Sequence, residues 1–189
     1  MEKEITFDEI KLLFLETREQ MKETDKKFQE TDKKFQETDR LLKEITGELG
    51  GIGKSNGQIA EDFFYSALEN NMKVGKLQFD YIDRNFNRKR NSIQSQYDII
   101  LYNEYKVLIV EVKHNFKKKY LLDFYKNIKN FKILFPEYKE FKIFGAIAGM
   151  TIEEDALLEA KEFGFFILTQ NNQNIQMLNE PDFEPNVIK

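Results

Sequence analysis

Two carboxylates and one amine lie at the ends of neighbouring apolar stretches in this sequence. Asp98 directly precedes the apolar stretch 99–102, and Glu111 and Lys113 lie at the end of the apolar stretch 107–112. Short runs of β-branched and aromatic residues around a polar break predict a β-hairpin. The second stretch is typical of a central strand covered on both faces, which is a poor place for charge. The three charged residues are therefore candidates for one chemical task.

The length of the loop between the two strands decides whether these charges meet. A four-residue loop pairs Tyr102 with Val107. Counting back along both strands then sets Asp98 opposite Glu111, with Cβ atoms roughly 4.5–5.5 Å apart. Lys113 points the same way as Glu111 because side chains alternate along a strand. A two-residue turn keeps the carboxylates on one face as diagonal neighbours, whereas an odd-numbered loop sends them to opposite faces.

Paired carboxylates beside an amine suit one kind of chemistry. Two carboxylates this close repel each other unless a proton or a cation lies between them. Their oxygens are hard ligands that suit Mg²⁺ or Mn²⁺, with water completing the coordination shell. The ammonium of Lys113 can orient an attacking water or neutralise charge that develops on a phosphate. The combination predicts metal-assisted hydrolysis of phosphodiester bonds.

Asp98, followed on the next strand by Glu111, Val112 and Lys113, resembles the D…(D/E)-x-K core of the PD-(D/E)XK nuclease superfamily. The resemblance implies that Asp98, Glu111 and the Val112 carbonyl bind the metal ion. It implies that Lys113 positions the attacking water. A helix ahead of the sheet often supplies one more acidic residue in this superfamily. Glu61 matches that position, and a solvated surface glutamate is the alternative interpretation.

The resemblance covers about residues 55–180, and Tyr97 stands where the name of the superfamily has proline. It implies an α/β (α+β) fold: a restriction-endonuclease-like αβββαβ core with a mixed central sheet flanked by helices. The chain also resembles a bacterial branch of the superfamily that joins N-terminal heptad repeats to such a domain.

The three-residue pattern by itself has little specificity. Glutamate-x-lysine also occurs at residues 9–11, 104–106, 137–139, 140–142 and 159–161. The copy at residues 111–113 differs from these because it ends an apolar strand and has an aspartate placed to face it. The context of the motif, and not the motif alone, carries the prediction.

The composition limits the class of protein. The 189 residues are 41% hydrophobic, carry a net charge of −4 and include no cysteine, which excludes disulfides and thiolate metal sites. The first ten residues lack the basic-then-apolar order of a signal peptide, and no apolar run reaches the length of a membrane span. We expect a cytoplasmic protein with no membrane segment and no small-molecule cofactor.

Basic residues are concentrated just after the candidate site. Residues 113–132 contain seven lysines and one aspartate. Lysines on a helix that begins beside the carboxylates can hold a phosphate backbone through salt-sensitive contacts. The expected partner is DNA, and the residues assigned to this role are Lys117, Lys118, Lys119, Lys126 and Lys129. The second basic segment, 85–91, is expected to be a solvated loop.

A seven-residue repeat runs through the first fifty residues. Residues 23–29 and 30–36 are the same heptad, ETDKKFQ, and ETDRLLK follows. Such a repeat predicts a coiled coil. The a positions are Phe7, Phe14, Met21, Phe28, Phe35, Leu42 and Leu49, and the d positions are Ile10, Thr17, Thr24, Thr31, Thr38 and Ile45. Gly47, Gly50 and Gly51 are expected to end the helix.

The repeat divides the chain into two predicted parts. Residues 1–50 are predicted to form a coiled-coil oligomerisation helix and residues 51–189 a nuclease-like domain, joined by a flexible glycine-rich segment. A narrow apolar stripe on a charged helix cannot be buried within its own chain. We therefore expect a homo-oligomer through residues 7–49, of open order. A solvated single helix and a helix folded onto the domain are the alternatives.

The remaining segments complete the predicted αβββαβ order. Helices are expected at about 56–70, 120–135 and 151–163, and strands at about 76–84, 142–150, 165–169 and 175–178. The leading hypothesis is a metal-dependent nuclease. A second is a catalytically inactive nucleic-acid-binding or assembly module with the same fold. A third is a scaffold in which the coiled coil is the functional part.

Overall fold

The computed structural model describes residues 7–188, except the side chains of residues 9, 10 and 43–50. The chain divides into two compact units, one ending at Ile52 and the other running from Gly53 onward. In residues 7–188, no helix is both long and apolar enough to cross a membrane.

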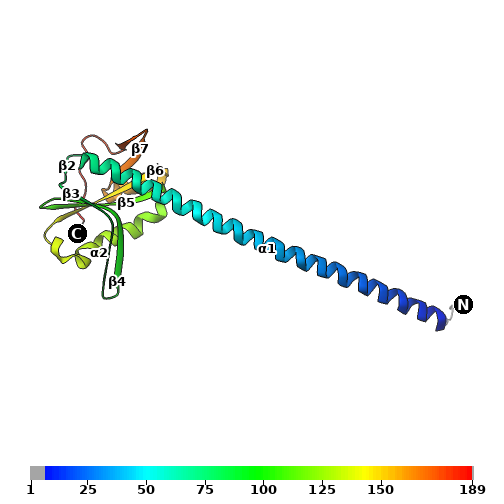
Figure 1. Cartoon of the computed structure of the whole chain (residues 1–189). Coiled ribbons are helices and arrows are strands. Elements are labelled where there is room, and N and C mark those ends of the chain that lie inside the picture. The colour runs from blue at the N-terminus through cyan, green and yellow to red at the C-terminus, as the bar shows by residue number, and fades with distance from the viewer. Residues whose placement is uncertain (1–6, 189) are drawn as a thin grey trace. The chain divides into compact units, whose positions relative to one another are not determined.

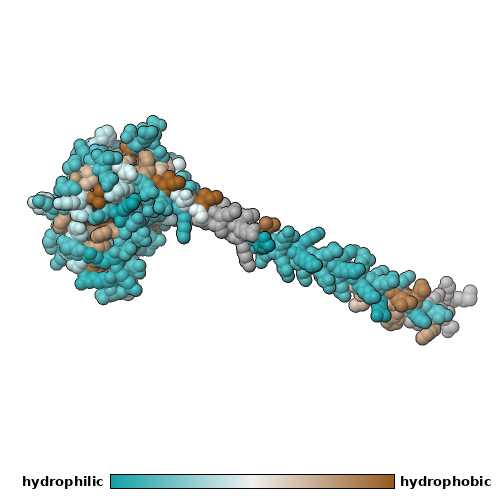
Figure 2. Space-filling view, in the orientation of Figure 1, coloured by the Kyte–Doolittle hydropathy of each residue, from teal (hydrophilic) through white to brown (hydrophobic). Residues whose placement is uncertain are grey.

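Helix α1 runs from Phe7 to Asn71. Its residues up to Ile52 belong to the first unit, and its residues from Gly53 onward belong to the second. The predicted a-position side chains are exposed, with fractions of 66% at Met21 and Phe28 and 71% at Phe35. Figure 2 shows hydrophilic side chains over most of the visible helix, with hydrophobic ones gathered near its N-terminal end. The side chains of the predicted seam residues Ile10, Ile45 and Leu49 lie outside the described residues.

The hydroxyl groups of the threonines at the d positions are hydrogen-bonded within their own helix. Each hydroxyl donates to the carbonyl four residues earlier at 2.7–2.8 Å, as in Thr24 to Gln20 and Thr31 to Lys27. Because the polar atom is bonded to its own helix, only the methyl group is left for a partner helix. The predicted seam therefore alternates large a residues, most of them phenylalanine, with small apolar surfaces at the threonine d positions.

The predicted helix end at Gly47 to Gly51 is wrong, because the glycine-rich segment predicted to follow it is helical. Helix α1 continues through Gly50, Gly51, Gly53 and Gly57. A C-capping glycine adopts a left-handed conformation, but among described residues only Gly75 and Gly164 are glycines with positive φ. A helical glycine costs about 1 kcal/mol relative to alanine. This cost does not by itself stop a helix that has good helix formers on both sides and no proline.

Replacing Gly57 by alanine is therefore expected to stabilise the second unit by about 0.5–1 kcal/mol. A Cβ atom added there meets no atom within 4 Å. Urea denaturation followed by tyrosine fluorescence measures this, because all 8 tyrosines lie between residues 65 and 138. Gly164→Ala is the opposing control, since Gly164 has φ +71° and a Cβ there would collide with Asn186. Equal losses of stability in both variants would contradict the prediction.

The second unit is built on a six-stranded mixed sheet with the order β3-β4-β5-β6-β7-β8 (Figure 1). Its strands are β3 (Tyr81–Arg90), β4 (Ile93–Tyr102), β5 (Lys106–Phe116), β6 (Lys142–Ile152), β7 (Phe166–Asn171) and β8 (Asn174–Met177). The pairs β5–β6 and β6–β7 are parallel and the others antiparallel. A separate hairpin is formed by β1 (Lys73–Val74) and β2 (Leu77–Gln78).

Helices cover both faces of this sheet (Figure 1). On one face, α2 (Leu121–Leu134) and α3 (Glu154–Phe163) pack in a core rich in phenylalanine. On the other, the C-terminal part of α1 buries Ala60, Phe64 and Leu68 against strands β4 to β7. Short 3₁₀ turns, η1 (Lys118–Tyr120) and η2 (Pro136–Tyr138), flank α2. The order α1-β3-β4-β5-α2-β6 is the predicted αβββαβ series, which confirms the predicted fold class.

The predicted strand 76–84 and the predicted solvated loop 85–91 are wrong in their boundaries. Residues 77–78 form β2, whereas β3 extends to Arg90 and turns at Asn91, which has φ 55°. A polar segment forms a strand here because it is the edge of the sheet and largely exposed. Its one large apolar side chain, Phe86, stacks on Phe135 with ring centroids 4.7 Å apart.

Two arginines of β3 bind the C-terminal end of α2. Arg88 Nη1 donates to Glu137 Oε1 at 2.6 Å, and Arg90 Nη1 donates to the Ile133 carbonyl at 2.9 Å. The last carbonyl groups of a helix lack intrahelical partners and carry partial negative charge. These arginines therefore hold the β3–β4 hairpin on the helix, a fold contact that the charge run alone did not reveal.

Candidate active site

The β4–β5 hairpin has the register that a four-residue loop predicts. Tyr102 pairs with Val107, and the ladder continues to Ile99 and Val110. The Asn103 side chain closes the turn, because its Oδ1 atom accepts hydrogen bonds from the Tyr105 and Lys106 amides, both at 3.0 Å. This local bond is the reason a polar break at this point makes a tight turn.

Asp98 lies one step beyond the last of these pairs and is held by its neighbour strand. The Val112 N–H donates to Asp98 Oδ2 at 2.8 Å. Tyr97 is buried in the core beneath α2, whereas Ile99 is buried in the core beneath α1. Strict alternation would place both on one face, so β4 changes face at Asp98. The aspartate is directed toward β5 at the place where the regular ladder ends.

The ammonium of Lys113 gathers the predicted ligand oxygens around one point. Its Nζ atom lies 2.6 Å from Glu111 Oε1, 2.9 Å from the Val112 carbonyl oxygen and 3.4 Å from Asp98 Oδ2. Asp98 and Glu111 therefore contact the same ammonium group. The odd-numbered loop does not occur, because Tyr102 pairs with Val107.

The charged groups of this cluster are largely buried, which changes their pKa values. The side chains of Asp98 and Glu111 are 11% and 17% exposed, and that of Lys113 is 32% exposed. Burial, and then the charge of Asp98, raise the pKa of Glu111 to about 7. Burial alone would lower the pKa of Lys113, but the charges of Glu111 and Asp98 outweigh it and raise that pKa. The lysine is therefore held as a cation between the two acids.

Glu61 on α1 faces the same cluster. Burial raises the pKa of Glu61, and the charge of Asp98 raises it further, against the opposing effect of Lys113. Glu61 and Asp98 also line one cavity of about 480 Å³ between α1 and strands β3 and β4. The structure thus brings the four predicted catalytic residues together, although Glu61 forms no hydrogen bond with the other three among the bonds of residues 7–188.

The donor atoms fit a hard divalent cation with few protein ligands. Two carboxylate oxygens and a backbone carbonyl converge within 3.4 Å of one nitrogen position. Mg²⁺ is bound in this way, through one or two carboxylates with water in the remaining positions. In the described part of the chain, no group of three or more His, Cys, Asp or Glu side chains is arranged for an ion. Two carboxylates and one carbonyl would leave the other positions around a bound ion to water.

Three of the five lysines assigned to nucleic acid form ion pairs. Lys117 pairs with Glu153 and Lys118 with Glu159, both at 3.2 Å, and Lys126 pairs with Asp123 at 3.4 Å. Their side chains remain 44–72% exposed. Exposed pairs contribute little to stability and exchange partners readily. The lysines are therefore partly neutralised in the free protein but still accessible.

The other two lysines lie over aromatic rings. Lys119 Nζ is 5.1 Å from the centre of the Tyr120 ring, and Lys129 Nζ is 4.8 Å from the centre of the Tyr125 ring. Lys113 also lies 6.0 Å from the Tyr120 ring, so the start of α2 is next to the carboxylates. Lys129 instead lines a separate hollow with Phe163 and Val187.

Sequence reasoning missed Arg84 as a site residue. Arg84 pairs with Ile99, the residue after Asp98, and lines the 480 Å³ cavity together with Asp98. Arg84 directly precedes the basic segment 85–91. Its position beside Asp98 becomes apparent only once the β3–β4 register is known.

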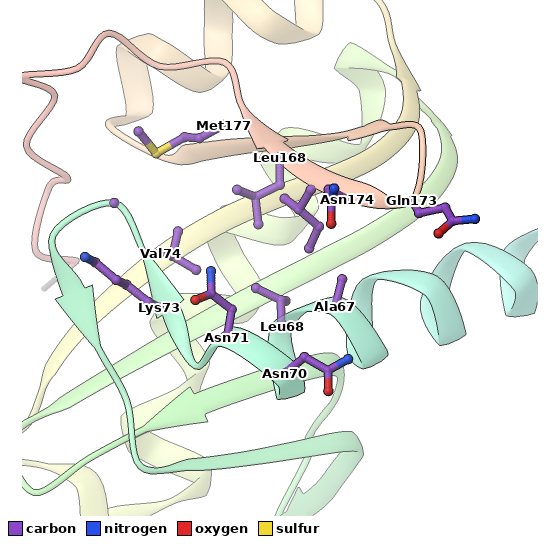
Figure 3. A pocket seen from close by; sticks show the side chains of 12 residues that line it. Ala67, Leu68, Asn70, Asn71, Lys73, Val74, Leu168, Gln173, Asn174 and Met177 are labelled. Atoms are coloured by element: carbon purple, nitrogen blue, oxygen red, sulfur yellow. The ribbon is translucent and has the colours of Figure 1, made fainter.

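A larger cavity lies elsewhere in the second unit. It has a volume of about 690 Å³ and lies between the end of α1, the β1–β2 turn and the β7–β8 hairpin. Figure 3 shows Leu68, Val74 and Leu168 at its base and Lys73 and Gln173 at its margin. Its lining contains no acidic side chain and no histidine. It therefore lacks the paired carboxylates on which the candidate active site is based.

Comparison with solved structures finds several matches. The crystal structure of a repair endonuclease from Pyrococcus abyssi superposes with a TM-score of 0.46 at 12% sequence identity. The match covers 59% of this chain and 46% of that chain, so this chain matches less than half of the endonuclease. No protein-family model and no curated protein matches the sequence.

Proposed function

We propose that this protein is a metal-dependent nuclease that hydrolyses phosphodiester bonds in DNA and is oligomerised by its N-terminal coiled coil. One observation carries the proposal: Asp98, Glu111, the Val112 carbonyl and Lys113 converge within 3.4 Å at the end of a buried hairpin. A fold needs no buried cluster of two acids and an amine at this place. Metal-assisted phosphodiester hydrolysis needs such a set.

In this proposal each residue has a defined task. Asp98, Glu111 and the Val112 carbonyl would hold Mg²⁺ or Mn²⁺. When bound, the ion supplies positive charge that polarises the phosphate and lowers the pKa of a coordinated water. The Val112 N–H fixes the Asp98 carboxylate in place. Lys113, held as a cation, donates a hydrogen bond to the attacking water or to a phosphate oxygen.

Glu61 has a supporting role in the proposed reaction. Its raised pKa and its place in the cavity beside Asp98 suit a carboxyl that exchanges a proton with water there. Lys117, Lys118, Lys119, Lys126 and Lys129 would hold the DNA backbone. Phosphates replace the carboxylate partners of three of these lysines, so binding should weaken steeply with salt.

The proposed oligomer is formed by residues 7–49, and residues 51–189 carry the chemistry. Exposed Phe14, Met21, Phe28 and Phe35 repeat every seven residues along a charged helix. Helices that pair along this stripe would bury it by knobs-into-holes packing.

A cleavage assay tests the proposed activity. The full chain is incubated with labelled duplex, single-stranded and branched DNA in Mg²⁺, in Mn²⁺ or in chelator. We expect metal-dependent cleavage that is lost in Asp98→Asn and retained in Asp80→Asn, a matched change at an exposed aspartate. Binding without cleavage under all metal conditions would favour the inactive binding module instead. This second candidate is kept because the Lys113 ammonium contacts all three oxygens that would bind the ion.

The coiled coil carries a separate prediction. Replacing both Phe28 and Phe35 by lysine is expected to convert the oligomer to a monomer, because two like-charged layers replace two apolar ones. Sedimentation equilibrium of the full chain measures the change in mass. Gln29→Lys with Gln36→Lys adds the same charge one residue away from the stripe and should leave the mass unchanged. A wild-type monomer at all concentrations would refute the oligomer.

A further inference from the structure

The lining of the cavity beside Asp98 includes two basic side chains that have no role in the candidate catalytic cluster. Its volume is about 480 Å³, and it lies within the second unit. Helix α1 contributes Lys54, Gly57, Gln58, Glu61 and Asp62, and strands β3 and β4 contribute Arg84, Asn85, Asp98 and Ile99. The lining thus has three acidic side chains, Glu61, Asp62 and Asp98, and two basic ones, Lys54 and Arg84.

Arg84 is held in a fixed orientation between the sheet and the helix. Its Nη1 atom donates to Asp62 Oδ1 at 3.0 Å, and its guanidinium lies 5.1 Å from the centre of the Tyr65 ring. A guanidinium has five N–H donors, and Asp62 accepts from one of its nitrogens. The Arg84 side chain is 55% exposed, so its remaining donors are accessible. Arginine in this arrangement is suited to a phosphate.

The candidate catalytic cluster by itself repels a polyanion. When ionised, Asp98, Glu111 and Glu61 carry three negative charges against the one positive charge of Lys113. A divalent ion cancels this difference at most, so the cluster has no positive charge left for further phosphates of the strand. Cations next to the cluster have to hold the neighbouring phosphates of the strand. In the cavity that contains Asp98, Arg84 and Lys54 are the basic side chains of the described lining.

The size of the cavity limits what enters it. A volume of about 480 Å³ falls in the range of small-molecule sites, roughly 300–1,000 Å³. One nucleotide fits in such a space, whereas a base-paired duplex does not. A strand that enters the cavity between α1 and β3 must therefore be unpaired there.

We infer that Arg84, assisted by Lys54, binds the phosphate next to the cleaved one and accepts it from an unpaired strand. The inference rests on the proposed function for the position of the cleaved phosphate. It names the substrate class, which is DNA with a single-stranded or flap-like segment at the site. Arg84 is a specificity-determining residue in this assignment.

Equilibrium binding without divalent ions tests the inference independently of cleavage. A fluorescent single-stranded oligonucleotide and its duplex are titrated with the full chain in chelator over a range of salt. We expect tighter binding of the single strand. Arg84→Gln should weaken it about tenfold, the value of one charge-assisted hydrogen bond. The slope of log affinity against log salt should fall by about 0.7, as for one phosphate contact on a single strand.

Arg90→Gln is the matched control, because it removes the same charge from the same strand but from a side chain bound to the Ile133 carbonyl. Arg84→Lys should restore part of the salt slope. If Arg84 only anchors α1 through Asp62, Arg84→Gln will lower the free energy of unfolding and leave the salt slope unchanged, which overturns the inference. Equal losses in Arg84→Gln and Arg90→Gln, a preference for duplex, or no binding at all also overturn it. If the binding results are as expected but no DNA is cleaved in Mg²⁺ or Mn²⁺, the inference about Arg84 is supported and only the proposed nuclease activity is contradicted.

Discussion

Replacing Lys113 by methionine is expected to slow metal-dependent DNA cleavage by about 10²–10³-fold, the usual cost of removing one group that stabilises the transition state. Methionine keeps most of the length and volume of the side chain but has no ammonium to orient water or balance charge on the phosphate. The same change should strengthen binding of the divalent ion. In the free protein Lys113 Nζ contacts the three oxygens that would hold the ion, so the ion and the ammonium compete for them.

These opposite effects separate a catalytic lysine from a structural one. Ion binding is measured as the rise in melting temperature with added Mg²⁺ or Mn²⁺, and cleavage is measured on the same samples. Lys142→Met is the matched control, because Lys142 also ends a glutamate-x-lysine triplet but is exposed at the start of β6. Weaker ion binding together with slower cleavage would mean that Lys113 supports the ligands rather than the chemistry. Unchanged cleavage would remove Lys113 from the mechanism.

Sequence reasoning placed the central part of the candidate site because the contacts that define it are local. Asp98 and Glu111 belong to one hairpin, and a four-residue loop is enough to align them. The heptads, the core stripe of α2 and the αβββαβ order also depend on spacing within short segments. Patterns of this kind report which face of an element is apolar, and the fold follows from burying those faces.

The parts that sequence reasoning missed depend on contacts between distant segments. Nothing near Arg84 indicates that β3 extends to Arg90, because its partners are β4 and the C-terminal end of α2. The acidic partners of Lys117 and Lys118 come from residues 153 and 159, which lie beyond β6 in the sequence. The glycines of α1 were misread because glycine at a helix end and glycine inside a helix look alike until φ is known.

The stability of the metal-free protein is expected to fall as pH rises from 5 to 8, and Glu111 should account for about 3 kcal/mol of that fall. The pKa of Glu111 is raised from the model-peptide value of 4.5 to about 7, chiefly by burial. Between these two values the folded state binds a proton that the unfolded state has released. The free energy of unfolding therefore decreases with pH in this interval. The contribution is complete below pH 4.5 and is lost as pH passes through about 7.

Comparison of wild type with Glu111→Gln isolates this contribution, because glutamine has the same shape and does not titrate. In chelator, the free energy of unfolding of wild type relative to Glu111→Gln should drop by about 3 kcal/mol between pH 5 and pH 8. Glu140→Gln, at an exposed glutamate of the same triplet pattern, should give a difference that is independent of pH. Added Mg²⁺ should recover stability at pH 8 in wild type and less in Glu111→Gln, since only the ionised carboxylate is a strong ligand. A difference between wild type and Glu111→Gln that stays constant with pH would show that Glu111 is ionised throughout. Lys113 would then neutralise it fully, and the two acids would impose no strain for a metal ion to relieve.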